Sequence, residues 1–131
     1  MRTLGVDLAA QPKSTASCDI DWDTGCDRVV EVYPAAALRR WGLELAGYER
    51  TPEARGRIAA AIAAALPGLA VAAWDSTLRA SADVLDALVA SLVCRAKLLG
   101  LVDPLPPEHA SAAMAEGWTW VPQSDALSRL R

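Results

Sequence analysis

The feature that most constrains the fold is an apolar stripe in residues 82–99. Its members recur every three or four positions, the spacing that puts side chains on one face of an α-helix; they are Leu85, Leu88, Val89, Leu92, Ala96 and Leu99. Ser81 is a favourable N-cap for such a helix, and Gly100 is a favourable end. We therefore predict a capped helix from about Ala82 to Leu99, which must bury this stripe against the rest of the chain.

Three acids stand next to apolar segments. Asp83 and Asp86 lie one turn apart at the start of the predicted helix, and Asp7 ends a short apolar segment that we interpret as a strand. Acids near a core cost free energy unless a partner or a cation compensates them. Asp7 has the alternative of a turn in which backbone amides satisfy it. Asp83 has the alternative of a favourable helix-dipole interaction of about 0.3–1 kcal/mol, so we favour Asp86 over Asp83.

Composition indicates one folded, acidic domain. The chain has 131 residues, of which 53% are hydrophobic, and this is enough for a single domain over residues 1–131 with its own core. Its formal net charge is −3, so a contact with nucleic acid would need metal ions or a local basic patch. The candidates for that patch are Arg39, Arg40, Arg50, Arg55 and Arg57.

Targeting and membrane signals are not evident in the sequence. The longest apolar run, Ile58 to Leu66, is too short to span a bilayer, so we expect no membrane partner. The N-terminus has no basic segment followed by an apolar run, so we expect no signal peptide and a cytoplasmic location. Three widely spaced cysteines predict neither a disulfide framework nor a zinc site.

Turn residues and hydrophobic periodicity divide the rest of the chain into strands followed by helices. The predicted strands are Arg2–Asp7, Thr15–Trp22 and Arg28–Tyr33, and the further predicted helices are Ala35–Leu45, Pro52–Leu66 and Glu108–Ala115, with residues 69–79 ambiguous. We expect the first two strands to pair antiparallel. The result is an α/β fold in which a small mixed sheet of about three strands packs with three or four helices.

Several short motifs occur in a fixed order along the chain. They are Gly5-Val6-Asp7-Leu8-Ala9 with Pro12-Lys13-Ser14-Thr15, Glu31-Val32-Tyr33-Pro34 running to Trp41-Gly42, Gly47-Tyr48, Asp83 with Asp86-Ala87-Leu88-Val89, and Glu116-Gly117-Trp118 with Val121-Pro122. In this order they resemble a family of predicted RNase H-like nucleases, known as domain-of-unknown-function family 429. The resemblance touches most of the chain and implies a reduced RNase H-like fold.

One departure from the family pattern is large. The resemblance implies a long central segment, including a strand with a further acid, before the Glu-Val-Tyr-Pro motif. Here Trp22 and Arg28 are separated only by residues 23–27. The chain is therefore similar to an internally shortened member, and the acid of the missing strand has no positional match.

The resemblance implies that Asp7, Asp83 and Asp86 bind Mg²⁺ or Mn²⁺ at a nuclease site. Glu31 is the candidate for the missing acid. If its strand folds back beside the second strand, Glu31 lies away from Asp7. If the strand crosses to run parallel beside the first, a connection of roughly 10 Å brings the two acids together. We favour the crossing, because the resemblance places this strand on the far side of the first one.

Two functions remain open at this point. The first is a metal-dependent nuclease acting on DNA or RNA, and the second is a catalytically inactive member that binds a partner or forms a homodimer to cover exposed sheet edges. Aromatic side chains bear on the choice, because they stack on bases or fill the core. We expect core packing for Tyr33, Trp41, Tyr48, Trp118 and Trp120.

Overall fold

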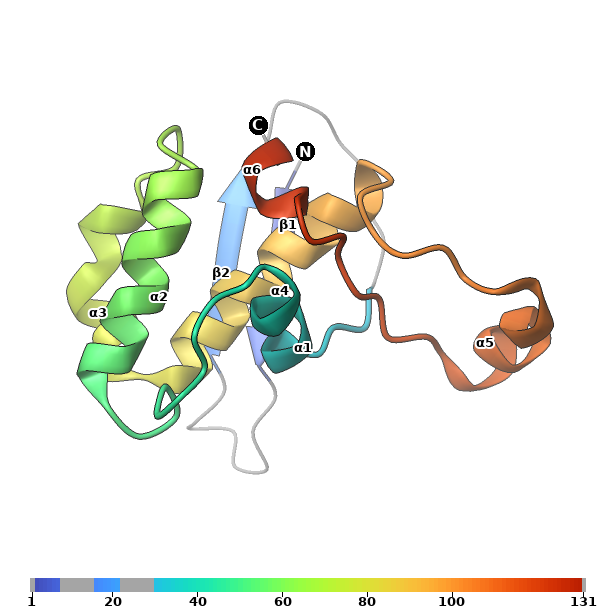
Figure 1. Ribbon diagram of the computed structural model, residues 1–131, viewed down its shortest axis with the longest axis horizontal. Coiled ribbons are helices and arrows are strands. Elements are labelled where there is room, and N and C mark those ends of the chain that lie inside the picture. Colours follow the sequence, from blue (N-terminus) through green and yellow to red (C-terminus); the bar gives the residue numbers. More distant parts are fainter. Residues whose placement is uncertain (1, 8–15, 22–29, 131) are drawn as a thin grey trace.

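The computed structural model describes residues 2–7, 16–21 and 30–130. Within them the chain forms a pair of strands and then a series of helices (Figure 1). The strands are β1 (Arg2–Asp7) and β2 (Ala16–Asp21). The α-helices are α1 (Pro34–Arg40), α2 (Pro52–Ala65), α3 (Asp75–Ala80), α4 (Ala82–Leu98), α5 (Ala110–Glu116) and α6 (Ala126–Arg129). Two 3₁₀ turns, η2 (Val71–Trp74) and η3 (Pro107–His109), precede α3 and α5.

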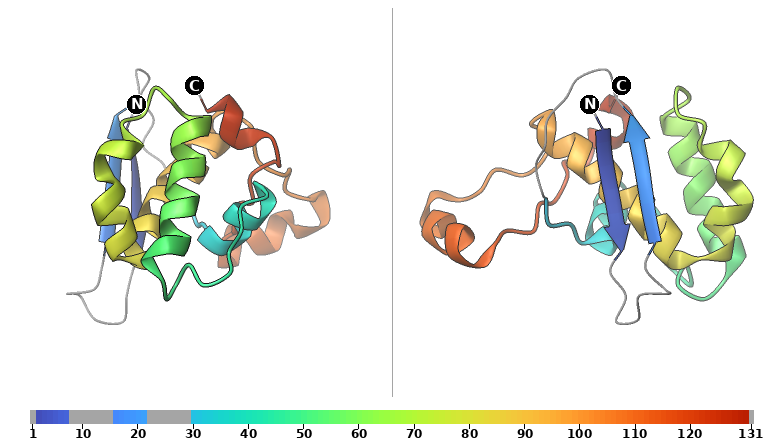
Figure 2. Two further views of the ribbon diagram at one scale, coloured as in Figure 1. Left: turned by 60° about the vertical axis from the view of Figure 1, so that its left-hand side comes forward. Right: turned by 180° about the vertical axis from the view of Figure 1, so that it is seen from behind.

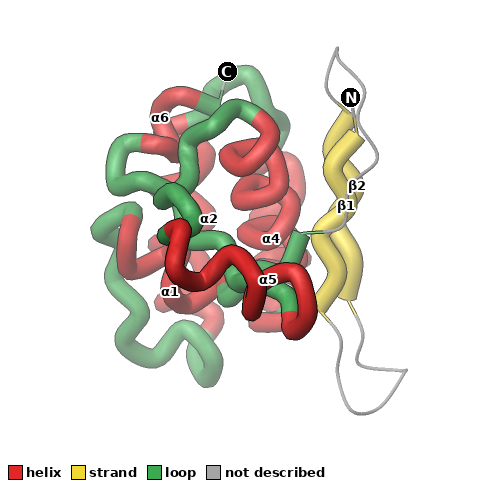
Figure 3. The backbone as a smooth tube through the Cα atoms, turned by 90° about the vertical axis from the view of Figure 1, so that its right-hand side faces the viewer, coloured by secondary structure: helices red, strands yellow, loops and turns green. Residues whose placement is uncertain are grey.

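Helix α4 is the centre of the molecule. Figure 3 shows the strand pair along one side of α4, with α1 and α2 on the opposite side. Its fully buried side chains form the middle of the core; they are Leu85, Val89, Leu92, Val93 and Ala96. The apolar stripe of the sequence is thus buried as predicted except at its last member, Leu99, and α4 is covered from two sides rather than one.

The sheet differs from the prediction. Strands β1 and β2 pair antiparallel, with Arg2 opposite Asp21 and Asp7 opposite Ala16, and they form a two-stranded sheet. The described part of the predicted third strand, residues 30–33, is not a strand; Glu31 makes only one isolated parallel bridge, to Thr119. The predicted α/β fold with a mixed sheet of about three strands, and the reduced RNase H-like core built on it, is therefore wrong for the described residues.

Residues 30–33 do not form the predicted strand because of the partner with which they pair. Their β-branched sequence favours an extended backbone, but a strand also needs a neighbouring strand with which to form a ladder. Pro34 begins α1 immediately afterwards, and the neighbour at Thr119 contributes one bridge. We expected this segment to run parallel beside β1; the described sheet contains only β1 and β2. Residues 23–27, where the chain resembles a shortened family member, lie outside the described residues.

Helix boundaries follow their capping residues. The hydroxyl of Thr51 accepts a hydrogen bond from the Ala54 amide at the start of α2, and Ser81 accepts one from the Val84 amide at the start of α4, both at 3.4 Å. The predicted N-cap Ser81 is confirmed. Helix α1 ends earlier than predicted, because Gly42 adopts a φ of 72° and allows the Leu43 amide to bond back to Leu38.

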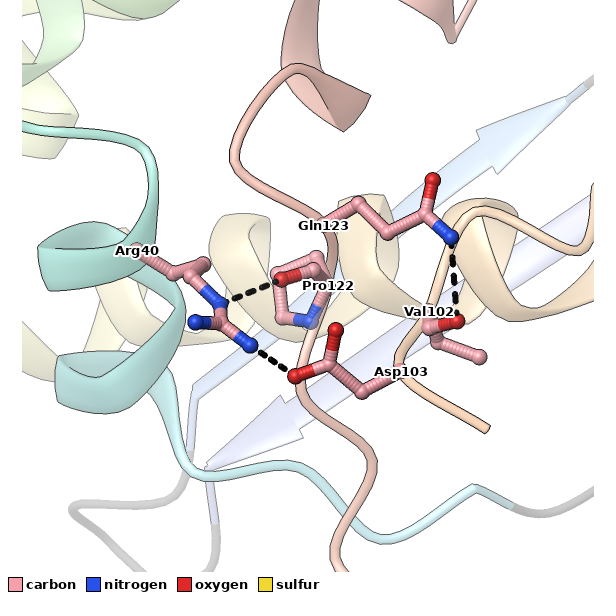
Figure 4. Close-up of polar contacts among 5 residues, drawn as sticks. All are labelled: Arg40, Val102, Asp103, Pro122 and Gln123. Carbon is pink, nitrogen blue, oxygen red and sulfur yellow. Dashed lines mark hydrogen bonds and ion pairs between the residues drawn. The ribbon is translucent and has the colours of Figure 1, made fainter. Parts of the chain in front are cut away.

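An extended arm, residues 103–121, leaves the body of the molecule and carries α5 at its far end (Figures 1 and 2). Its base is closed by an antiparallel bridge between Val102 and Pro122 and by a hydrogen bond of 2.9 Å from the Asp103 amide to the Val121 carbonyl. Arg40 of α1 donates to the Asp103 carboxylate and to the Pro122 carbonyl, so one guanidinium holds both sides of the base (Figure 4).

Aromatic contacts hold the rest of the arm in shape. His109 stacks on Trp118 with ring centroids 5.8 Å apart, and the Lys97 ammonium lies 3.3 Å from the centre of the Trp120 ring. A cation over an aromatic face is favourable by about 0.5–2 kcal/mol, depending on exposure. The expected core packing holds for Trp120, which packs against the core, whereas Trp118 packs on His109 within the arm.

No helix among the described ranges combines the length and the apolar character required to cross a bilayer.

The central position of α4 predicts a large effect of truncating it. Leu92 is fully buried, so Leu92→Ala should lower the free energy of unfolding by about 2–5 kcal/mol. Leu99, at the end of the same helix, is 40% exposed, and Leu99→Ala should cost less than about 1 kcal/mol. Urea denaturation of both variants measures the difference. Equal losses would show that α4 is not the core helix.

Candidate functional site

Asp86 projects from the second turn of α4 beside a buried tyrosine. Its side chain is half-buried, and one carboxylate oxygen lies 3.5 Å from the hydroxyl of Tyr48, at the outer limit of a hydrogen bond. Tyr48 is only 6% exposed. Asp83 is also half-buried and lies one turn earlier, in the first turn of the helix. The two helix acids predicted from the sequence therefore lie at the same end of α4, and Asp86 has a specific polar neighbour.

A buried arginine holds Tyr48 in place. Arg55 of α2, which is 5% exposed, donates from Nη1 to the Tyr48 carbonyl at 2.9 Å. Its Nε donates to the Arg79 carbonyl at the end of α3, at 2.7 Å. One guanidinium thus ties the turn before α2 to the end of α3. This buried site is also the reason why Arg55 does not belong to a surface basic patch.

The environment of Tyr48 disfavours its ionised form. Burial, followed by the negative charge of Asp86, raises the pKa of Tyr48 well above its ordinary value. The hydroxyl therefore keeps its proton and can act as a donor towards the Asp86 carboxylate at neutral pH.

Asp7 is the last residue of β1 and pairs with Ala16 of β2. Strand β1 packs on α4, and in Figures 1 and 2 the end of β1 and the start of α4 lie at the same end of the molecule. The backbone thus brings the Asp7 end of the strand towards the end of α4 that bears Asp83 and Asp86. The Asp7 side chain lies outside what the structure describes.

Glu31 lies at the arm instead. Its carboxylate accepts a hydrogen bond from the Thr119 hydroxyl at 2.9 Å, and its carbonyl accepts one from the Trp120 amide at 3.0 Å. A Cβ at Gly117 would come within 3.1 Å of the second carboxylate oxygen, so Gly117 leaves room for this acid. Glu31 therefore anchors the arm, and its role as a third catalytic acid stays a prediction without a supporting contact in the described residues.

Asp83 and Asp86 offer carboxylate oxygens at the same end of α4. Carboxylate oxygens are the ligands that Mg²⁺ and Mn²⁺ prefer. In the part of the chain whose side chains are described, no three His, Cys, Asp or Glu residues gather closely enough to hold a metal, so Asp83, Asp86 and Glu31 do not form such a group.

The arginines and aromatics named from the sequence are dispersed. Arg40 is bound to the arm base, and Arg57 lies 3.9 Å from Glu44. Tyr33 is 61% exposed at the start of α1, in contrast to the expected core position, whereas Trp41 is half-buried against the core.

A comparison with protein families identifies the chain. The model described as "Protein of unknown function (DUF429)" matches residues 8–111, which is most of the chain. The chain belongs to the DUF429 family. No curated protein and no solved structure matches it.

The DUF429 match contains Glu31, Tyr48, Asp83 and Asp86, and it begins immediately after Asp7. From the sequence, Tyr48 is expected to be a core residue, and its contact with Asp86 is not predicted. It also placed Arg55 on the surface, although Ile58, Ala59 and Ile62 follow it at helical spacing and are buried. An arginine on the apolar stripe of a helix was the signal that could have found it.

The raised pKa of Tyr48 predicts a specific alkaline loss of stability. Because the folded state holds this proton more tightly than the unfolded state, the stabilisation is present below the ordinary tyrosine pKa of about 10 and falls as the pH rises above it. In a Tyr33→Phe background, Tyr48 is the remaining tyrosine. The free energy of unfolding, measured by urea titration from pH 7 to 11, should then decline more steeply than in the Tyr33→Phe/Tyr48→Phe protein. Parallel curves above pH 10 would contradict the assigned environment.

Proposed function

We propose that this DUF429 protein is a metal-dependent hydrolase that cleaves phosphodiester bonds of nucleic acid. Asp7, Asp83 and Asp86 would hold Mg²⁺ or Mn²⁺. The observation that supports this proposal is the half-buried Asp86 beside Tyr48, at the end of α4 where β1 also ends. Asp83 and Asp86 lie at the same end of α4, and carboxylate oxygens are the ligands that Mg²⁺ and Mn²⁺ prefer.

When bound, such a cation activates a water molecule and neutralises charge on the phosphate. The chain itself would contribute the orientation of the carboxylates. Tyr48 donates towards one oxygen of Asp86 and restrains the rotation of that carboxylate. Because the chain carries a formal net charge of −3, a cation would also offset its repulsion of a polyanionic substrate.

The alternative function is a member that binds a partner or a second copy of itself without catalysis. The arm favours this second candidate. Helix α5 has no buried residue, and Met114 on it is 91% exposed, the largest exposure among the large apolar side chains of the described residues. Exposed apolar side chains on a projecting element are typical of contact sites.

Metal titration tests the first proposal. Mn²⁺ should raise the thermal midpoint of the wild-type protein, because a ligand that binds only the folded state stabilises it by about 2.7 kcal/mol at 100 times its Kd. The Asp7→Asn/Asp86→Asn variant should lose this rise. Asp125→Asn is the matched control, since Asp125 is an exposed acid that pairs with Arg129, and this variant should keep the rise.

Two outcomes would contradict the nuclease proposal. One is a wild-type midpoint that does not respond to Mn²⁺, and the other is an equal response in the Asp7→Asn/Asp86→Asn variant. If either result is obtained and the apparent molar mass in light scattering increases with protein concentration, self-association becomes the supported function.

A further inference from the structure

We propose that Tyr48 and Arg55 are positioning residues for the metal site, with Arg55 acting on Asp86 through Tyr48. This inference rests on the proposed function and adds two residues of this chain to it. Neither would touch the cation or the substrate. Together they would fix the direction in which the Asp86 carboxylate presents its oxygens.

The first step is the position of Arg55. Burying a guanidinium costs free energy unless hydrogen bonds compensate it. Arg55 is nearly fully buried, and its guanidinium donates to two backbone carbonyls of the described residues, those of Tyr48 and Arg79. The planar guanidinium presents donors in a fixed geometry, so it sets the separation of the two carbonyls that it binds.

The second step is the backbone of Tyr48. Its amide donates to the Leu45 carbonyl at 3.1 Å, and its carbonyl accepts from Arg55. The preceding Gly47 adopts a φ of 76°, which a residue with a side chain rarely does, and the Thr51 amide bonds back to the Gly47 carbonyl at 2.9 Å. Both polar groups of the Tyr48 backbone are therefore held, which fixes the point from which its side chain leaves the turn.

The third step is the contact with Asp86. The phenol reaches from the turn before α2 to the second turn of α4, where its hydroxyl lies 3.5 Å from the Asp86 carboxylate. A hydroxyl that donates to one carboxylate oxygen orients the whole group, as outer partners of metal ligands commonly do. A small shift of the turn would remove this contact, because the distance is already long for a hydrogen bond.

A purely structural role for Arg55 makes a different prediction. As a donor to the end of α3 it would stabilise the fold, and its loss would lower the thermal midpoint without changing the affinity for a cation. The Kd for Mn²⁺, measured where every variant is folded, separates the two roles.

The experiment uses the full chain and Mn²⁺ alone, with free Mn²⁺ followed by electron paramagnetic resonance. Tyr48→Phe should raise the Kd about tenfold, the lower end of the range for outer-shell partners. Arg55→Lys keeps the charge but cannot reproduce the two fixed donors, and it should raise the Kd several-fold. Because Arg55 acts through Tyr48, Arg55→Lys should have no further effect in the Tyr48→Phe background.

Leu130→Ala is the control for lost stability. Leu130 is fully buried and directly follows α6, and α6 lies at the end of the molecule opposite the start of α4 (Figure 1). This variant should lower the thermal midpoint and leave the Kd unchanged.

Failure of the proposed function can be distinguished from failure of this inference alone. A wild-type protein that binds no Mn²⁺ overturns both the proposed function and this inference. Wild-type binding with an unchanged Kd in Tyr48→Phe and Arg55→Lys overturns this inference alone. Equal and additive effects of the two substitutions would also overturn it, because they would show that Arg55 does not act through Tyr48.

Discussion

The burial of α4 is the constraint on which the rest of the structure depends. A helix whose apolar residues extend around most of its surface needs neighbours on more than one side. The strand pair covers one side, and α1 and α2 cover the other. The two acids of α4, Asp83 and Asp86, therefore lie in its first two turns, on the face that its neighbours leave accessible. Asp86 is half-buried because of this arrangement, and its neighbour Tyr48 comes from the turn that connects α1 to α2.

Helices α2 and α4 could be predicted from the sequence because their signals are local, whereas α3 lies in the ambiguous stretch and α6 was not predicted. Thr51 and Ser81 cap the helices that follow them, and Gly100 follows the end of α4 with a positive φ. Each signal involves residues within one or two turns of each other. The spacing of apolar residues in α4 likewise required no knowledge of what covers it.

The pairing of β1 with β2 agrees with the prediction, but the position of residues 30–33 and the arm could not be predicted in the same way. A strand depends on a partner that is distant in the sequence, and the partner of Glu31 is Thr119 in the arm. Arg40 holds Asp103 and Pro122 across a similar separation. The pair Tyr48 and Asp86 is also formed by two separate elements. The acids of α4 were recognised from local sequence, whereas the tyrosine and arginine behind them depend on tertiary packing.

A direct measurement of the central claim, that acids of β1 and α4 share one cation, is the effect of Mn²⁺ on the aspartate side-chain carboxyl signals in ¹³C NMR. Paramagnetic broadening falls steeply with distance, so it reports which carboxylates lie beside the ion. Our account predicts that substoichiometric Mn²⁺ broadens the signals of Asp7, Asp83 and Asp86 together and leaves that of Asp125 sharp. Broadening that spares Asp7, or that affects Asp125 equally, would contradict a shared site.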